Sequence, residues 1–177
     1  MESIRYTVSQ SPILHQLFAV YEQSFPLHER RSFAAQQRLL AHPQYHCDCL
    51  LAQAVPVGLL WYWSDADMRY IEHFAIDPRC RGQQLGSRAL TAFLSQPGKV
   101  VLEIDPPTTD IARRRQRFYT RLGFCHCPQS HTHPAYHTQF APHPLVLMAA
   151  PAPLTPGEFV RFQHFLRETV MADCPVD

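Results

Sequence analysis

The sequence lacks any long apolar run. No stretch reaches the roughly 18–20 residues that a helix needs to span a bilayer, so no membrane-spanning segment is predicted. The opening residues MESIRYTVSQ contain no basic region followed by an apolar block, so we expect no secretory signal and a cytoplasmic location. Six cysteines among 177 residues are too sparse for a disulfide scaffold, and reduced thiols are expected.

An overall excess of charge is also missing, because the formal net charge is only +1. The charges are nevertheless unevenly distributed: between residues 79 and 121, nine basic residues stand against three acidic ones. This local excess favours an anionic ligand. Basic charge is not spread over the whole domain, and aromatic residues are not interleaved with the basic ones, so no nucleic-acid partner is predicted.

The apolar pattern predicts a mixed α/β (α+β) domain. Apolar residues make up 46% of the chain, enough for a substantial core, and no internal repeat or linker is visible. Alternation and helical spacing predict the order β-α-α-β-β-β-α-β-α-β-β, followed by a C-terminal helix. The Pro- and His-rich residues 128–143 are predicted to form a loop. The predicted elements are strands at 4–8, 68–77, 99–104, 124–127 and 144–149, a hairpin over 46–65 that turns at Val55-Pro56, and helices at 10–24, 28–41, 82–96, 110–122 and 155–172.

The segment IDPRCRGQQLGSRAL, residues 76–90, joins a predicted strand to a predicted helix. The start of a helix presents unpaired backbone N–H groups and the positive end of the helix dipole, and both attract phosphate. Gly82 permits close approach of the backbone, so the N–H groups from Arg81 to Ser87 are predicted to form a nest for a pyrophosphate. The alternative is an ordinary turn with solvated arginines. Neither GxxxxGK[ST] nor GxGxxG is present.

Two motifs in this chain resemble those of a known family. YIEHFAIDPRCRGQQLGSRAL resembles motif A of the GNAT superfamily of acetyl-CoA-dependent N-acyltransferases, an apolar strand followed by Q/R-x-x-G-x-G/A and a helix. Gln84 stands where Gly or Ala is usual, which keeps the backbone donors but removes conformational freedom. About 30 residues later, RFYTRLGF (117–124) resembles motif B. The resemblance covers about 1–150, and 151–177 is predicted to be a helical extension packed on the same domain.

The resemblance implies a central mixed, mostly antiparallel sheet of about seven strands, flanked by helices, with strands four and five splayed apart. Acetyl-CoA, as co-substrate, would lie in the gap. Its pantetheine arm would pair with the backbone of Phe74, Ala75 and Ile76, and one N–H group there would polarise the thioester carbonyl. No metal is predicted. The other residues expected to bind acetyl-CoA are Arg81, Gly82, Gln83, Gln84, Leu85, Gly86, Ser87 and Phe118.

Amine acylation needs a proton acceptor, because amines with pKa values of roughly 8 to 10.4 are mostly protonated near neutral pH. Glu72 is the candidate base: it shares a strand face with Phe74 and Ile76 and resembles the strand glutamate of several family members. Glu72 is alternatively a positioning or salt-bridged carboxylate. His73, on the other strand face, and Glu103 are further candidates for the same task.

The leaving thiolate needs a proton or a hydrogen-bond donor. Tyr119 matches the motif B tyrosine that usually serves as general acid, and the alternative is a buried aromatic ring with a satisfied hydroxyl. Ala112 and Arg115 stand where the family often has Asn and Ala, so the usual Asn contact to pantetheine is not carried over.

The predicted function is acetyl transfer from acetyl-CoA to a small-molecule or peptide primary amine by direct attack in a ternary complex, by a monomer or homodimer. The alternatives are a non-catalytic acyl-CoA-binding module and a nucleic-acid- or protein-binding domain on the same fold. The first two helices and residues 128–143 are expected to line the acceptor side. The zinc-competent residues Cys125, Cys127, His131, His133 and His137 follow no recognised finger spacing, so zinc is not predicted.

Overall fold

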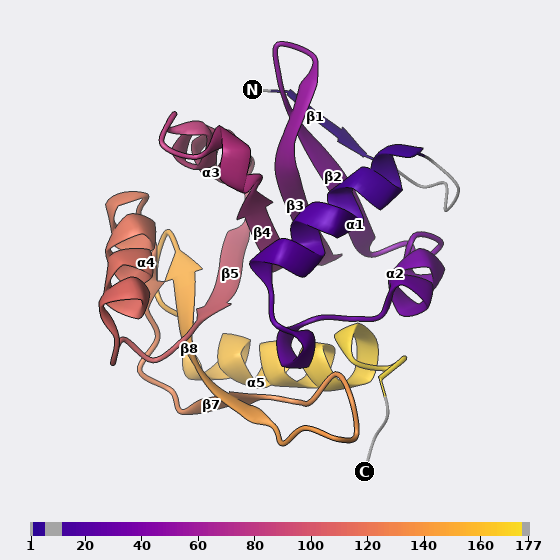
Figure 1. The fold of residues 1–177 in the computed structure, drawn as a ribbon. Coiled ribbons are helices and arrows are strands. Elements are labelled where there is room, and N and C mark those ends of the chain that lie inside the picture. Colours follow the sequence, from indigo (N-terminus) through magenta and orange to yellow (C-terminus); the bar gives the residue numbers. More distant parts are fainter. Residues whose placement is uncertain (1, 6–11, 175–177) are drawn as a thin grey trace. The chain divides into compact units, whose positions relative to one another are not determined.

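The computed structural model describes residues 2–5 and 12–174, which form a mixed α/β fold with an open, mostly antiparallel sheet flanked by helices (Figure 1). The chain divides into two compact units, residues 1–66 with 71–97, and residues 67–70 with 98–177. Strand β4 (Met68–Ile76) begins in the second unit and continues in the first. The predicted fold class is therefore confirmed. Residues 6–8 of the first predicted strand and 10–11 of the first predicted helix lie outside the described residues.

The first unit is built on strands in the order β1-β2-β3-β4. Strands β1 (Glu2–Arg5), β2 (Tyr45–Ala52) and β3 (Val55–Asp65) pair antiparallel with their neighbours. Helix α1 (Pro12–Ser24) packs on β3 through the ring of Tyr21, whose centroid lies 4.7 Å from that of Trp61 (Figure 1). The other elements of this unit are helices α1 (Pro12–Ser24), α2 (Phe33–Leu39) and α3 (Leu85–Leu94), with the short 3₁₀ turns η1 (Leu27–Glu29) and η2 (Pro78–Cys80).

The β2–β3 hairpin turns earlier than the sequence predicts. Gln53 and Ala54 form a two-residue turn with φ values of +52° and +61°, and the predicted turn residues Val55 and Pro56 lie inside β3. Two positive φ angles are typical of a hairpin turn that matches strand twist, and Asn-Gly usually marks it in a sequence. Because the sequence has no Asn-Gly here, Pro56 is the residue that suggests a turn. In the structure Pro56 lies opposite Leu51 at a register shift, where its missing N–H is tolerated.

The second unit is organised around strand β8 (His143–Ala150), which carries three antiparallel partners. Residues 146–150 pair with β5 (Lys99–Ile104), 148–149 with β6 (Cys125–His126) and 143–145 with β7 (His131–His133). The prediction of a loop over 128–143 is wrong for the residues of β7. A strand of three residues is too short to show an alternating pattern in the sequence. The strands of this unit are β5, β6, β7 and β8. Its helices are α4 (Asp110–Arg121), α5 (Pro156–Phe165) and the short π-helix η3 (Leu166–Val170).

The helices of the second unit begin and end at residues that the sequence marks. Thr109 caps α4 by accepting the Ala112 N–H, and Gly123, with φ of +95°, follows its last turn. Thr155 and Glu158 form a capping box at the start of α5. That helix packs its apolar face inward, where the ring centroid of Phe162 lies 5.2 Å from that of Tyr70. None of the helices in the described ranges is long and apolar enough to cross a membrane.

Candidate active site

The turn before helix α3 has the backbone geometry of an anion nest. Gly82 has φ of +79°, with no atom within 4 Å of where a Cβ would lie, and Gln84 takes the left-handed conformation with φ of +57°. The helix begins at Leu85, and the Arg88 N–H donates to the Gln84 carbonyl at 3.1 Å. The N–H groups of residues 85–87 therefore have no acceptor within the helix. Residues 81–84 of the turn are exposed, whereas Leu85 is buried and residues 86 and 87 are half-buried.

The two arginines of this turn differ in how they are held. Arg79 forms a bidentate pair with Asp77, with N–O distances of 2.6 and 3.0 Å, and this hydrogen bonding holds the pKa of Asp77 below its usual value. The Arg81 side chain makes one longer contact, from Nε to the Ile76 carbonyl at 3.3 Å. Arg81 is therefore the arginine whose guanidinium remains available for an anion.

The backbone of β4 lies close to β3 where the pantetheine contact was predicted. A Cβ on Gly58 would stand 2.3 Å from the Ala75 carbonyl oxygen, so only glycine fits there. Phe74 and Ile76 are half-buried, whereas Ala75 between them is buried. Gly58 thus fixes the path of the β4 segment that carries the predicted backbone contacts.

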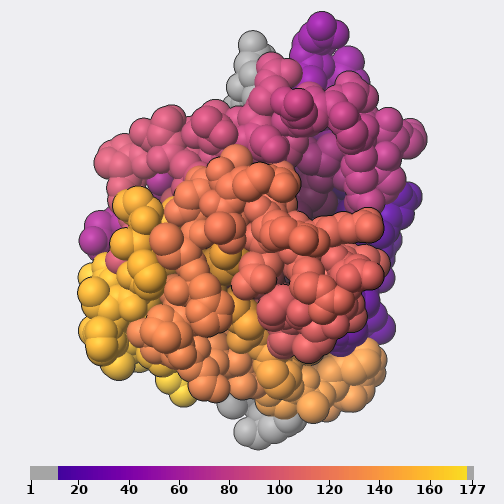
Figure 2. All heavy atoms as spheres, turned by 90° about the vertical axis from the view of Figure 1, so that its left-hand side faces the viewer, coloured from indigo at the N-terminus to yellow at the C-terminus, as the bar shows by residue number. Residues whose placement is uncertain are grey.

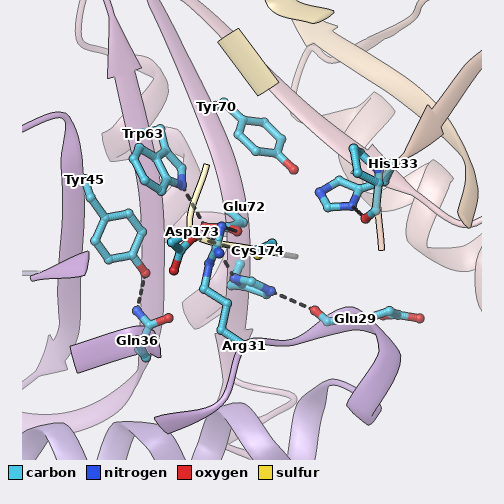
Figure 3. Close-up of polar contacts among 12 residues, drawn as sticks. Glu29, Arg31, Gln36, Tyr45, Trp63, Tyr70, Glu72, His133, Asp173 and Cys174 are labelled. Atoms are coloured by element: carbon cyan, nitrogen blue, oxygen red, sulfur yellow. Dashed lines mark hydrogen bonds and ion pairs between the residues drawn. The ribbon is translucent and has the colours of Figure 1, made fainter. Parts of the chain in front are cut away.

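Glu72 lies in a buried ion pair (Figure 3). Arg31 Nη2 donates to Glu72 Oε1 at 2.9 Å, and Trp63 Nε1–H donates to Glu72 Oε2 at 2.7 Å. The side chains of Arg31 and Glu72 are both fully buried. Both carboxylate oxygens therefore accept hydrogen bonds from strong donors, an arrangement that favours the ionised form. Neither Arg31 nor Trp63 is predictable as a partner of Glu72, because no local sequence pattern at either residue indicates a contact with β4.

His73 faces the other side of β4 and joins the same strand to the segment after α1. Its Nε2 lies 3.0 Å from the Glu29 carbonyl oxygen and 3.2 Å from the Tyr21 hydroxyl. A carbonyl oxygen only accepts, so the Nε2 proton donates to Glu29. The Tyr21 hydroxyl in turn accepts the Arg31 N–H at 2.9 Å. Residues 29–31 are thus tied to β4 through both His73 and Glu72.

Tyr119 lies on helix α4 in the second unit, with Phe118 beside it. The ring centroids of Phe118 and Phe124 lie 5.2 and 5.6 Å from that of Tyr119. Burial raises the pKa of Tyr119 to about 12, with a smaller opposing effect from Arg115. Among the residues that the structure describes, none forms a hydrogen bond with the Tyr119 hydroxyl. The alternative reading of Tyr119, a buried aromatic ring whose hydroxyl is satisfied by a hydrogen bond, therefore has no support among the described residues.

Glu103 lies on β5 in the second unit, in a cluster that the sequence analysis did not predict. Tyr70 donates its hydroxyl proton to Glu103 Oε2 at 2.6 Å, and His131 Nε2 contacts Glu103 Oε1. Gln163 on α5 donates to His131 Nδ1 at 2.6 Å. The sequence signal for this cluster is His-Thr-His on a strand, which puts His131 and His133 on one face.

The arginine run on α4 lies at the surface of the second unit (Figure 2). Arg113 pairs with Asp110 at 2.8 Å and Arg115 with Asp105 at 2.7 Å. Arg114, Arg117 and Arg121 are exposed. These arginines form a solvated face of the helix.

The model of the acetyltransferase (GNAT) family matches residues 13–124. A Bacteroides thetaiotaomicron protein assigned to the same family is 24% identical, with a TM-score of 0.90 over 96% of this chain and 98% of that one. The ribosomal-protein-S18-alanine N-acetyltransferase of Escherichia coli is 17% identical, with a TM-score of 0.61 over 87% of this chain and 96% of that one.

An aminoglycoside 6′-N-acetyltransferase complexed with coenzyme A is also similar in structure. It is 15% identical, with a TM-score of 0.63 over 88% of this chain and 99% of that one. A search of curated proteins found no match. The family match spans more than half of the chain and includes motif A and motif B, which the sequence analysis identified. The chain belongs to the GNAT family of acetyltransferases.

Proposed function

We propose that this protein transfers an acetyl group from acetyl-CoA to a primary amine, by direct attack within a ternary complex. The observation that supports this most is the turn before α3, where positive φ angles at Gly82 and Gln84 lead into a helix start whose N–H groups at residues 85–87 have no acceptor within the helix. A diphosphate is the ligand that such a turn suits. Arg81 supplies positive charge beside it.

The donor is held mainly by backbone in this proposal. The diphosphate of acetyl-CoA lies on residues 82–87, and the pantetheine arm pairs with the backbone of Phe74 to Ile76 as an added strand would. The close contact between Gly58 and Ala75 keeps that segment of β4 in place. One N–H group of the segment donates to the thioester carbonyl oxygen, where negative charge develops as the amine attacks.

Tyr119 serves the leaving thiolate in this mechanism. Its pKa of about 12 keeps the hydroxyl protonated at any working pH. A thiol has a pKa of about 8.5, so complete proton transfer from this tyrosine would be uphill by about 5 kcal/mol. Tyr119 therefore stabilises the thiolate as a hydrogen-bond donor while the C–S bond breaks. The amine nitrogen releases its proton to water, and the thiolate takes up a proton from water to leave as free CoA.

The contacts of Glu72 support the positioning role among the alternatives. A base needs a lone pair that faces the substrate, whereas both oxygens of Glu72 already accept hydrogen bonds from Arg31 and Trp63. In this proposal Glu72 fixes residues 29–31, on the expected acceptor side, against β4. The base role of Glu72 remains a prediction that kinetics can test.

A thiol-release assay tests the proposed function directly. Purified protein with acetyl-CoA is offered polyamines, aminoglycosides, amino acids and peptides with an N-terminal alanine, and free CoA is measured over time. We expect amine-dependent release from the wild type, and a higher KM for acetyl-CoA in Arg81→Ala than in Arg88→Ala, an exposed arginine further along α3. Binding of acetyl-CoA without release to any amine would instead support the non-catalytic module.

A further inference from the structure

Lysine is almost missing from this chain. Of the 16 lysines and arginines, 15 are arginine and one, Lys99, is lysine. A guanidinium keeps its proton in proteins, so an arginine has no amine lone pair with which to attack an acetyl group. A lysine that loses a proton does have one. Lys99 is therefore the single side chain of the sequence that can form a stable amide with an acetyl donor.

Two acceptors hold the Lys99 ammonium at the start of β5. Nζ donates to Glu158 Oε2 at 2.7 Å and to the Pro153 carbonyl oxygen at 3.2 Å. Only 15% of the Lys99 side chain is exposed. All three residues belong to the second unit. While the ammonium donates these bonds, Nζ has no lone pair and is largely covered, so attack on an acetyl group requires that the contact break first.

Glu158 is itself fixed in the orientation that receives Lys99. Its Oε2 also accepts the Thr155 N–H at 2.7 Å, as part of the capping box at the start of α5. The hydrogen bond from Lys99, followed by that from the Thr155 N–H, lowers the pKa of Glu158 to about 2. The carboxylate is therefore ionised at neutral pH and remains a charged partner for the ammonium.

We infer that Lys99 is the one acetylation site among the side chains of this protein, and that its contacts with Glu158 and Pro153 protect it in the folded state. The other basic positions carry arginine and are inert to acetyl donors. The protein therefore does not compete with an acceptor amine for acetyl groups. This inference concerns the reactivity of the chain toward an acetyl donor, so it goes beyond the proposed function and does not rest on catalysis.

Acetylation of Lys99 by a thioester breaks the protecting contact. The ammonium gives one proton to water, and the freed Nζ lone pair attacks the carbonyl carbon. The N–C bond forms, the C–S bond breaks, the nitrogen releases a second proton, and the thiolate leaves with one proton as a thiol. One proton is thus released overall. The resulting acetamide is neutral, so Glu158 loses the cation of its ion pair.

Two lysines compared in one molecule test the protection. Arg114 on α4 is exposed and forms no hydrogen bond or ion pair with the described residues, so Arg114→Lys supplies an unprotected amine. The variant is treated at pH 8 with sulfosuccinimidyl acetate, an acetyl donor that needs no enzyme, and peptide mass spectrometry follows each site. We expect Lys99 to react at least tenfold more slowly than position 114, and both to react equally in denaturing urea. Equal rates in the folded protein would overturn the inference.

Two further variants separate the ion pair from the stability of α5. Glu158→Gln removes the carboxylate that holds Lys99 and should raise the acetylation rate of Lys99 at least fivefold. Thr155→Ala removes the hydroxyl that accepts the Glu158 N–H at 3.3 Å but keeps the carboxylate, and should change that rate less than twofold. Equal acceleration in both variants would mean that loosening of the helix exposes Lys99, which contradicts the inference. No step here is acetyl transfer by the protein, so failure of this inference is distinct from failure of the proposed function.

Discussion

Glu72 shows how a residue's partners decide what it can do. Its carboxylate is buried with the Arg31 guanidinium, so removing the negative charge takes an ion-pair partner away from a cation in the interior. We predict that Glu72→Gln lowers the free energy of unfolding by about 3 kcal/mol, measured by urea denaturation at pH 7. Glu22→Gln removes the partner of Arg30 in a pair whose glutamate is half-exposed, and should cost less than about 1 kcal/mol. Equal losses in the two variants would contradict the anchoring role.

The Tyr119 hydroxyl is expected to act in turnover and not in binding of acetyl-CoA. Tyr119→Phe should lower kcat at least tenfold and leave the Kd for acetyl-CoA nearly unchanged, because the hydroxyl acts only as the C–S bond breaks. Since its pKa is about 12, ionisation of this hydroxyl should cause no loss of rate below about pH 10. A variant with wild-type turnover would remove Tyr119 from the mechanism.

The turn before helix α3 is the element on which binding depends, and Gln84 strains it. A residue other than glycine in the left-handed region costs about 1–2 kcal/mol, partly offset because glycine is more flexible in the unfolded chain. We predict that Gln84→Gly raises the free energy of unfolding by about 0.5–1 kcal/mol in urea denaturation. Gln83→Gly, at a neighbour without positive φ, should lower it instead. Destabilisation by both glycines would show that Gln84 is not strained.

Helix α5 gives a prediction with a defined pH range. Lys99 donates to Glu158 Oε2 at 2.7 Å, and this bond, with the N–H of Thr155, lowers the pKa of Glu158 to about 2 from about 4.3 in the unfolded chain. A carboxyl with a lowered pKa stabilises the fold above the unfolded value, and that contribution disappears as pH falls toward 2. Glu158→Gln should therefore cost about 1–2 kcal/mol in urea denaturation at pH 7 and progressively less below pH 4. A cost that does not change with pH would mean that the charge of Glu158 is not involved.

Local patterns predicted most of the elements but few of their partners. The capping box at Thr155, the glycine at 123 and the glycine-containing turn at 82 are signals within a few residues of the structures they specify. The hairpin turn at Gln53 and the strand β7 carry no such signal. The partners of Glu72 were also missed, because Arg31 and Trp63 are distant from it in sequence and only folding brings them together. Sequence reasoning thus identified the backbone of the site more completely than its side-chain contacts.

For the whole molecule, we predict that bound acetyl-CoA stabilises the fold. A ligand that binds only the native state raises the free energy of unfolding by about 2.7 kcal/mol at a concentration 100 times its Kd. For a chain of 177 residues this corresponds to a Tm increase of about 5–10 °C. Thermal unfolding with and without acetyl-CoA measures it, and the Arg81→Ala variant should need more ligand for the same shift. An unchanged Tm at saturating ligand would contradict this prediction.

The most direct test of whether the turn before α3 binds the diphosphate of acetyl-CoA is isothermal titration calorimetry of the purified protein with acetyl-CoA, because this measurement needs no acetyl transfer. We predict one molecule bound per chain, competition by free CoA, and much weaker competition by pantetheine, which lacks the diphosphate. A flat titration, or pantetheine that competes as well as CoA, would contradict it.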